Sequence, residues 1–323
     1  MPRRRVNVSQ PLLDVRNLKK YFRVKGGDLH AVDDVSVKIN ASSTLGVVGE
    51  SGCGKSTLGR TILRLHEPTS GKVFFDGEDV MKFKRQNLKS FRTKAQIIFQ
   101  DPYSSLNPRM SVEEIIAEFM IVNKTYRSKS EIKKRTAELM DIVGLAARLA
   151  TAYPHELDGG RRQRIGIARA LSVNPKFIVC DEPVSALDVS IQAQILNLLM
   201  DLQRDLTIAY MFITHDLSVV KHISNEIAVM YLGKCVEIAP SGELFRNPRH
   251  PYTKALIEAI LVADISMRYK KIEIIKGEIA SPVDPRPGCR FAVRCPFVGD
   301  ICSMPQELVE LSEGHFVACS KPL

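Results

Sequence analysis

The sequence has no long apolar run. No stretch reaches the ~18 consecutive apolar residues that a membrane-spanning helix needs, although 45% of the 323 residues are hydrophobic. No apolar segment follows the basic start, Met1 to Arg5, as a secretory signal peptide would require. Both absences predict a globular protein that remains in the cytosol.

An alternation of basic and aromatic residues is also missing. The formal net charge is nevertheless +10, from 46 basic and 36 acidic residues, and a positive surface attracts nucleic acid or the anionic face of a membrane. Without interleaved aromatics nothing favours nucleic acid, so we predict no nucleic-acid partner. A generally solvated basic surface and a lipid contact through Arg3 to Arg5 both stay open.

Strand and helix patterns alternate along most of the chain, which predicts an α/β fold with a mostly parallel sheet. A block that is helical throughout, about 101–171, predicts an inserted helical subdomain, and after about residue 245 the composition shifts to Pro, Arg and Cys. The predicted strands are 12–15, 31–39, 73–75, 97–100, 177–180 and 208–213, and the predicted helices are 57–65, one capped by Ser111, one capped by Ser130 and one starting at Ser190.

One stretch organises the prediction of function. Residues 49–57 match the G-x-x-x-x-G-K-[ST] pattern of phosphate-binding loops. They lie between a predicted buried strand and a helix that carries Leu58, Ile62 and Leu65 on one face. In this context the glycines let successive N–H groups point at phosphate, and the helix N-terminus adds partial positive charge. We predict that Lys55 reaches the β- and γ-phosphates and that the Ser56 hydroxyl holds Mg²⁺. The predicted nucleotide-binding loop is Gly49, Glu50, Ser51, Gly52, Cys53, Gly54, Lys55, Ser56 and Thr57.

Two carboxylates follow another predicted buried strand. Asp181 and Glu182 come directly after the apolar run 177–180. An aspartate in this position can hold Mg²⁺ opposite Ser56, and the next carboxylate can polarise an attacking water. Two acids that cap a surface turn are the plainer alternative. Because the pair accompanies a phosphate-binding loop, we predict a nucleotidase.

Several further stretches share one interpretation with these two. Residues 12 to about 245 resemble an ABC-transporter ATP-binding subunit, which implies a P-loop ABC ATPase fold with a RecA-like sheet core and the inserted helical subdomain. The resemblance implies that Phe22 or Tyr21 stacks on adenine and that Gln100 is the Q-loop glutamine near Mg²⁺ and the water. It also implies that His215 is the switch histidine near the γ-phosphate. The implied catalytic residues are Lys55, Gln100, Glu182 and His215, and Asp188 closes a D-loop that starts at Ser185.

The signature motif departs from the family. Residues 157–161 read Leu-Asp-Gly-Gly-Arg where the family has Leu-Ser-Gly-Gly-Gln, and the resemblance implies that Asp158, Gly159 and Gly160 contact the nucleotide of a second subunit. The family serine donates a hydrogen bond to the γ-phosphate. An ionised aspartate cannot donate, and in a water-poor site its repulsion costs on the order of a kcal/mol or more.

We therefore predict an asymmetric heterodimer in which the site built on Lys55 and Glu182 is the competent one. The alternative is that Asp158 simply caps its helix, with Arg161 one turn on neutralising it.

Local stretches point to a subgroup. Residues 100–109, 181–194 and 250–253 resemble the dipeptide/oligopeptide importer ATPases, the second of the two paired ATPase subunits in particular. The resemblance implies ATP hydrolysis that drives peptide uptake at the cytoplasmic face of the membrane. The implied partners are a sister ATPase, two transmembrane permeases and an extracytoplasmic peptide-binding protein. It divides the chain into an ATPase domain, 1–245, and a C-terminal oligopeptide-transporter extension, 246–323. An importer ATPase for nickel or a glycopeptide, and a soluble ABC ATPase without a transporter, stay open as alternatives.

Four of the seven cysteines crowd the end of the chain. Cysteines in a cytosolic protein argue against disulfides, and Cys289, Cys295, Cys302 and Cys319 lack the C-x2-C pairing of zinc ribbons. Four thiolates can hold either Zn²⁺ or a [4Fe–4S] cluster. The surrounding Pro-Gly-Cys-Arg-Phe and Arg-Cys-Pro stretches resemble the importer extension, which implies the iron–sulfur cluster. Zinc and unligated thiols stay open. The remaining cysteines, Cys53, Cys180 and Cys235, are predicted to be packing residues.

Overall fold

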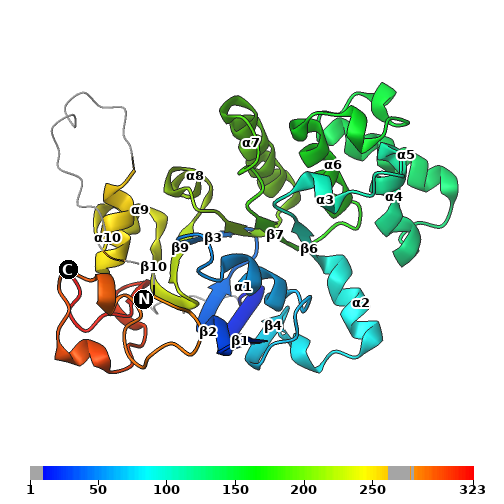
Figure 1. The fold of residues 1–323 in the computed structure, drawn as a ribbon. Helices are drawn as coiled ribbons and strands as arrows, with labels where there is room; N and C mark the ends of the chain where they lie inside the picture. Colours follow the sequence, from blue (N-terminus) through cyan, green and yellow to red (C-terminus); the bar gives the residue numbers. More distant parts are fainter. Residues whose placement is uncertain (1–9, 261–276, 278–279) are drawn as a thin grey trace, which may run out of the picture.

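A computed structural model describes residues 10–260, 277 and 280–323, and its centre is an eight-stranded sheet (Figure 1). The strand order is β11-β12-β10-β9-β3-β8-β7-β6. The five strands from β9 to β6 are parallel to one another, whereas β10, β12 and β11 join antiparallel at the other edge. The bounds are β3 Thr44–Val48, β6 Ala95–Ile98, β7 Phe177–Asp181, β8 Ala209–Ile213, β9 Glu226–Tyr231, β10 Lys234–Pro240, β11 Val309–Ser312 and β12 His315–Val317. The predicted parallel sheet is therefore confirmed for the central strands.

A second, antiparallel sheet packs over one face of the first. Its order is β2-β1-β4-β5, and the alternation of buried and more exposed residues over residues 33–39 of β2 matches a sheet with one buried face. The two predicted strands 12–15 and 31–39 are parts of one long hairpin that turns at Gly26. The bounds are β1 Leu13–Val24, β2 Gly27–Ile39, β4 Ser70–Phe75 and β5 Glu78–Asp79.

The central strands are apolar on both faces because both are covered. Along β7, Phe177 and Val179 face the core shared with helix α1 and the antiparallel sheet, and Ile178 and Cys180 face the core shared with α7. Figure 1 shows α1 between the two sheets and α7 and α8 on the opposite face. The bounds are α1 Lys55–Ile62, α2 Arg85–Lys94, α7 Val189–Leu206, α8 Leu217–Ile223, α9 Ser241–Arg246 and α10 Pro251–Glu258. Helix α1 ends before Leu65, which is exposed rather than on the buried face as predicted.

The inserted helical block forms one end of the molecule (Figure 1). Ser111 caps α4 through a capping box with Glu114, as predicted. The next cap is Ser128 rather than Ser130, because the Ser128 hydroxyl accepts from the Glu131 backbone N–H and Ser130 is inside the helix. The helices of the block are α3 Pro102–Ser105, α4 Val112–Asn123, α5 Lys129–Ile142 and α6 Gly159–Leu171.

The C-terminal segment closes the opposite end (Figure 1). Strand β12 pairs with β10, and Tyr252 and Phe291 share an apolar cluster with Val48, the last residue of β3. The predicted division at residue 245 stays a prediction, but the two parts share a sheet and a core. The short 3-10 helices are η1 Val80–Lys82, η2 Ala147–Leu149, η3 Pro154–Glu156, η5 Ala292–Arg294 and η6 Asp300–Ser303. Within the part of the chain that the structure describes, no helix has the length and apolar character needed to cross a bilayer.

Candidate nucleotide site

The motif residues gather at one edge of the large sheet. The loop 49–54 follows β3, Gln100 follows β6, Glu182 follows β7 and His215 follows β8. These four strands are neighbours and parallel, so their carboxyl ends meet at the same edge, where α/β sheets bind ligands. The residues line one pocket of about 770 Å³ together with loop residues Ser51, Gly52, Gly54, Lys55, Ser56 and Thr57.

Lys55 is buried at the start of α1 and is held by the loop itself. Its Nζ donates to the carbonyl oxygens of Gly49 at 2.9 Å and Glu50 at 3.3 Å, and lies 3.8 Å from Glu182 Oε1. The loop needs glycine at two points. A Cβ on Gly54, at φ 88°, would lie 1.7 Å from the carbonyl oxygen of Ala31, and one on Gly49 would lie 2.1 Å from that of Met230. The backbone of the loop is thereby fixed against β2 and β9.

Ser56 and Asp181 meet as the spacing predicts. The Ser56 hydroxyl donates to Asp181 Oδ1 at 2.5 Å, and Arg60 Nη2 lies 3.2 Å from the other carboxylate oxygen. Asp181 is completely buried, and a buried carboxylate requires such partners. Arg60, one turn along α1, has no place in the sequence motif and is the partner that sequence reasoning missed.

Glu182 is the centre of the polar constellation. Its Oε2 accepts a hydrogen bond from Gln100 Nε2 at 2.9 Å and lies 3.4 Å from His215 Nδ1. Its backbone is left-handed, with φ 47°, which costs a non-glycine residue energy and is concentrated at functional sites. The Glu182 carboxylate is thus held between the amide of Gln100, the imidazole of His215 and the ammonium group of Lys55.

One aromatic of the β1–β2 hairpin lines the pocket. Phe22 does so beside Leu29 and His30. Tyr21 instead stacks on His30, with ring centroids 3.8 Å apart, and its hydroxyl donates to Asp33 at 2.5 Å. Of the two predicted adenine-stacking residues, the structure brings only Phe22 to the pocket.

Three loop residues lie away from the pocket. Gly49 contributes its carbonyl oxygen to Lys55. Glu50 points toward the C-terminal segment, where its carboxylate accepts from Arg294 at 2.9 Å. Cys53 is buried, and burial raises the pKa of its thiol to about 11. Cys180 and Cys235 are buried too, so the prediction of packing cysteines is confirmed for all three.

The altered signature lies outside this pocket. Asp158 caps α6, where its Oδ1 accepts from the Arg161 backbone N–H at 2.8 Å, and the Arg161 guanidinium lies 3.4 Å from its other oxygen. Gly159 and Gly160 pack against Leu187 and the α7 residue Ile191. Asp188 is exposed at the start of α7. None of the four belongs to the pocket lining, so within one chain they do not meet Lys55.

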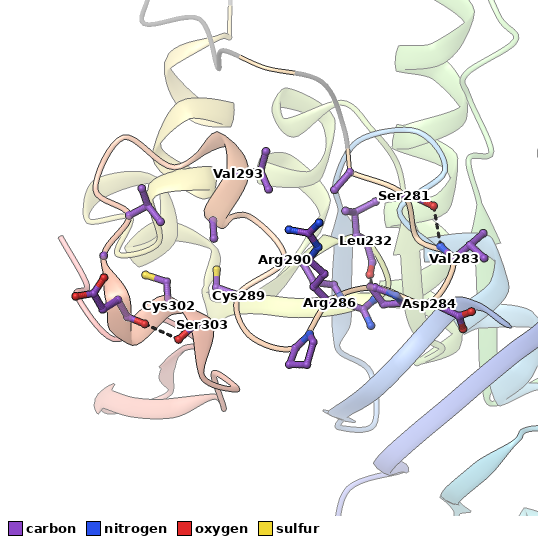
Figure 2. Close-up of a pocket in the computed structure, with 17 residues that line it drawn as sticks. Leu232, Ser281, Val283, Asp284, Arg286, Cys289, Arg290, Val293, Cys302 and Ser303 are labelled. Carbon is purple, nitrogen blue, oxygen red and sulfur yellow. Dashed lines mark hydrogen bonds between the residues drawn. The ribbon is translucent and has the colours of Figure 1, made fainter. Parts of the chain in front are cut away.

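The four C-terminal cysteines converge. Cys289, Cys295, Cys302 and Cys319 line one small pocket with Phe291. Burial raises the pKa of Cys289, and the nearby Cys302 raises it further. Figure 2 shows that Cys289 and Cys302 also line a neighbouring cavity with Arg286 and Arg290. Across residues 10–260, 277 and 280–323, no group of three or more His, Cys, Asp or Glu side chains has the arrangement of a metal-ion site.

Comparisons with known proteins identify the family. The profile described as "ABC transporter" matches residues 32–185, and the one described as "Oligopeptide/dipeptide transporter, C-terminal region" matches residues 236–302. The chain is 48% identical to the oligopeptide transport ATP-binding protein AppF of Bacillus subtilis, over 96% of this chain and 97% of that protein. It is also 48% identical to the oligopeptide transport ATP-binding protein OppF of Salmonella typhimurium, over 96% of each.

The fold is similar to that of the ATP-binding cassette MJ0796, solved as a dimer in a post-hydrolysis state with ADP and Pi. The TM-score is 0.65 at 28% identity, over 71% of this chain and 98% of the other. The two sheets, the motif residues at the sheet edge and the relatives agree: the chain belongs to the ATP-binding proteins of the oligopeptide/dipeptide ABC transporters.

Proposed function

We propose that this protein hydrolyses ATP and thereby energises uptake of dipeptides or oligopeptides across the cytoplasmic membrane. The observation that carries the proposal is the meeting of Lys55, Gln100, Glu182 and His215 in one pocket, in a chain whose relatives are named oligopeptide transport ATP-binding proteins. The proposed partners are a sister ATPase, two transmembrane permeases that hold the subunit at the cytoplasmic face, and an external peptide-binding protein.

The site residues divide the chemistry among them. When ATP binds, the Lys55 ammonium group leaves the loop carbonyl oxygens and contacts the β- and γ-phosphate oxygens. Phe22 stacks on the base. Glu182 accepts the proton of the attacking water, Gln100 orients that water, and His215 donates a hydrogen bond to the γ-phosphate. Phosphoryl transfer needs mainly positioning and charge stabilisation, and these groups supply both.

The residues beside Lys55 fit a magnesium ion. The hydroxyl of Ser56, the carboxylate of Asp181 and the amide oxygen of Gln100 are hard oxygen donors of the kind that Mg²⁺ prefers. When bound, Mg²⁺ neutralises charge that develops on the phosphates. Arg60 keeps the buried Asp181 carboxylate compensated and aimed at Ser56.

A second chain completes the site in this proposal. Asp158, Gly159 and Gly160 lie on a different surface from the pocket, so they face the nucleotide held by the sister ATPase, and Asp188 lies at the same junction. Asp158 places a carboxylate where the family serine donates. The heterodimer is then unequal, and the site built on Lys55 and Glu182 is the more active one.

Two substitutions test the effect of the carboxylate at this position. Asp158→Ser and Asp158→Asn both retain a good N-cap for α6, but only serine also supplies a hydroxyl for the γ-phosphate. We expect Asp158→Ser to raise the ATPase rate of the assembled complex. A rate equal to that of the original complex defeats the proposed impairment, and an equal gain with asparagine shows that the serine hydroxyl is not required.

For the four C-terminal cysteines we propose a [4Fe–4S] cluster. Their thiols share one pocket, and their chemistry suits iron. Burial raises the pKa of the Cys289, Cys295 and Cys319 thiols, and a positively charged metal group would offset that cost by stabilising the thiolates. The cluster would cross-link, and so stabilise, a small loop-rich segment. Anaerobically purified protein should be brown, absorb near ~400 nm and release four sulfides per chain; a colourless protein with one zinc contradicts this.

Reconstitution tests the transport function. The chain is co-expressed with its partner subunits, the co-purifying proteins are identified, and ATP-driven uptake of labelled peptides into proteoliposomes is measured. We expect ATP-dependent peptide accumulation that is lost with Lys55→Met. If nickel or a glycopeptide accumulates and no peptide does, the proposed substrate is wrong and the accumulated compound takes its place. ATPase activity without any membrane partner would contradict the transport proposal.

A further inference from the structure

The C-terminal segment contacts Glu50, the second residue of the phosphate-binding loop. The Glu50 carboxylate accepts from Arg294 Nη1 at 3.1 and 2.9 Å. The Glu50 backbone N–H donates to the Tyr252 hydroxyl at 3.0 Å. Arg294 also donates to the hydroxyl of Tyr231 at 3.4 Å. Glu50 is therefore held directly by side chains from α10 and η5, and Tyr231 of β9 supports Arg294.

This contact lies in an apolar setting. The Arg294 side chain is 8% exposed and that of Glu50 is 25% exposed. Tyr231, Tyr252 and Phe291 pack around it, with ring centroids 4.7 to 5.4 Å apart. Separating the pair would leave a poorly hydrated charge on each side, which is costly. The contact thus fixes Glu50 in one position.

Fixing Glu50 also fixes the loop that faces the phosphates. The carbonyl oxygen of Glu50 accepts from Lys55 Nζ at 3.3 Å and from the Cys53 N–H at 3.2 Å. Its N–H and carboxylate face the C-terminal segment, and its carbonyl faces the interior of the loop. A loop whose N–H groups must converge on phosphate gains from being held in that shape before the ligand arrives.

The same segment reaches the pocket from its other side. Pro282 lines the pocket beside Phe22, and its carbonyl oxygen accepts from the His30 N–H at 3.0 Å. Arg290, which Figure 2 shows beside Leu232, donates to the Leu232 carbonyl oxygen and pairs with Asp33 of β2. The C-terminal segment therefore contacts both the phosphate end and the base end of the site.

We propose that Arg294 is a positioning residue of the nucleotide site, which it shapes through Glu50. The C-terminal extension then helps to fix the shape of the ATP site. This inference rests on the proposed function, because it requires that loop 49–57 binds ATP. Arg294 touches neither nucleotide nor reacting atoms. Its effect should therefore fall on nucleotide binding.

The test compares variants of the full-length chain for binding of mant-ATP with Mg²⁺ and for the KM and kcat of ATP hydrolysis. Arg294→Met leaves Glu50 unpaired, and we expect the Kd of mant-ATP and the KM to rise about tenfold, with kcat within about twofold. Arg294→Lys, which keeps a charge, should stay within about threefold of the original Kd. Arg286→Met removes an exposed arginine of the same segment and should change neither value.

A double variant separates positioning from loss of fold. If Arg294 acts only through Glu50, adding Glu50→Gln to Arg294→Met should cause no further loss, and the Kd should stay within about twofold of that of Arg294→Met. Thermal unfolding of each variant shows whether it is folded. Unchanged binding in folded Arg294→Met, or a double variant in which the separate losses of Glu50→Gln and Arg294→Met multiply, overturns the inference. Absence of mant-ATP binding by the original chain contradicts the proposed function instead.

Discussion

A buried carboxylate at the junction of the two parts of the chain offers a sharp test of the structure. Glu237 lies in β10 and is completely buried. Its oxygens accept from the backbone N–H groups of Arg249 at 2.7 Å and His250 at 2.9 Å, and Oε1 lies 2.7 Å from Nε2 of His315 in β12. Glu237→Ala removes all three interactions and leaves the partners buried.

The expected cost follows from these three interactions. A hydrogen bond to a charged group contributes about 1.5–3 kcal/mol, and a buried donor left without a partner carries a penalty of similar size. Removing the carboxylate also removes the free-energy cost of burying its charge, and this gain offsets part of the lost stabilisation. We therefore expect Glu237→Ala to lower the free energy of unfolding by about 4 kcal/mol.

Urea unfolding of the full chain measures this difference. Glu243→Ala is the matched control, because Glu243 lies nearby on α9, accepts one hydrogen bond from Asn247 Nδ2 at 3.2 Å and approaches Arg246 at 3.7 Å in a partly exposed ion pair. Such a pair is worth about 0–1 kcal/mol. Glu237→Ala should also make the C-terminal segment sensitive to protease at urea concentrations that the control withstands. Equal unfolding midpoints for the two variants would refute the reasoning that Glu237 joins the segment to the core.

Two further predictions concern the nucleotide site. Ser56→Ala should lower Mg²⁺-dependent ATPase activity at least about tenfold, because the hydroxyl beside Asp181 is lost; Ser90→Ala, at an exposed position of α2, is its control, and an unchanged Mg²⁺ dependence contradicts the assigned site. Cys53 should resist iodoacetamide at pH 8 in the folded chain, since its pKa of about 11 leaves on the order of 0.1% thiolate. Mass spectrometry should find Cys53 alkylated only after denaturation, and rapid labelling of the folded chain contradicts its burial.

The residues at the strand ends were predictable because their signals are local. A phosphate loop after β3, a carboxylate pair after β7 and a polar residue after β8 are each carried by a few adjacent residues, and parallel strands bring such ends together. The same holds for the capping box at Ser111. At the next helix the S-x-x-E pattern of Ser128 and Glu131 is equally local, and the structure shows Ser128 as the cap in place of the predicted Ser130.

The contacts that shape the loop from outside were not predictable. Glu50 and Arg294 are 244 positions apart, and no period or motif links them. Within the loop pattern Glu50 is one of the variable positions, so nothing local distinguishes a residue that faces phosphate from one that faces another part of the chain. The same limit explains Tyr21, whose partner Asp33 lies across the hairpin, and the pairing of β12 with β10.

The central claim is that Glu182 is the proton acceptor of an ATP-hydrolysing site. Single-turnover hydrolysis and mant-ATP binding by Glu182→Gln test it most directly, with the protein assembled in its complex. The substitution keeps the size of the side chain and its contact with Gln100 but removes the base. We predict that hydrolysis falls about 10²- to 10³-fold while the Kd of mant-ATP changes by less than about threefold. Hydrolysis at the original rate, with binding intact, would contradict the account.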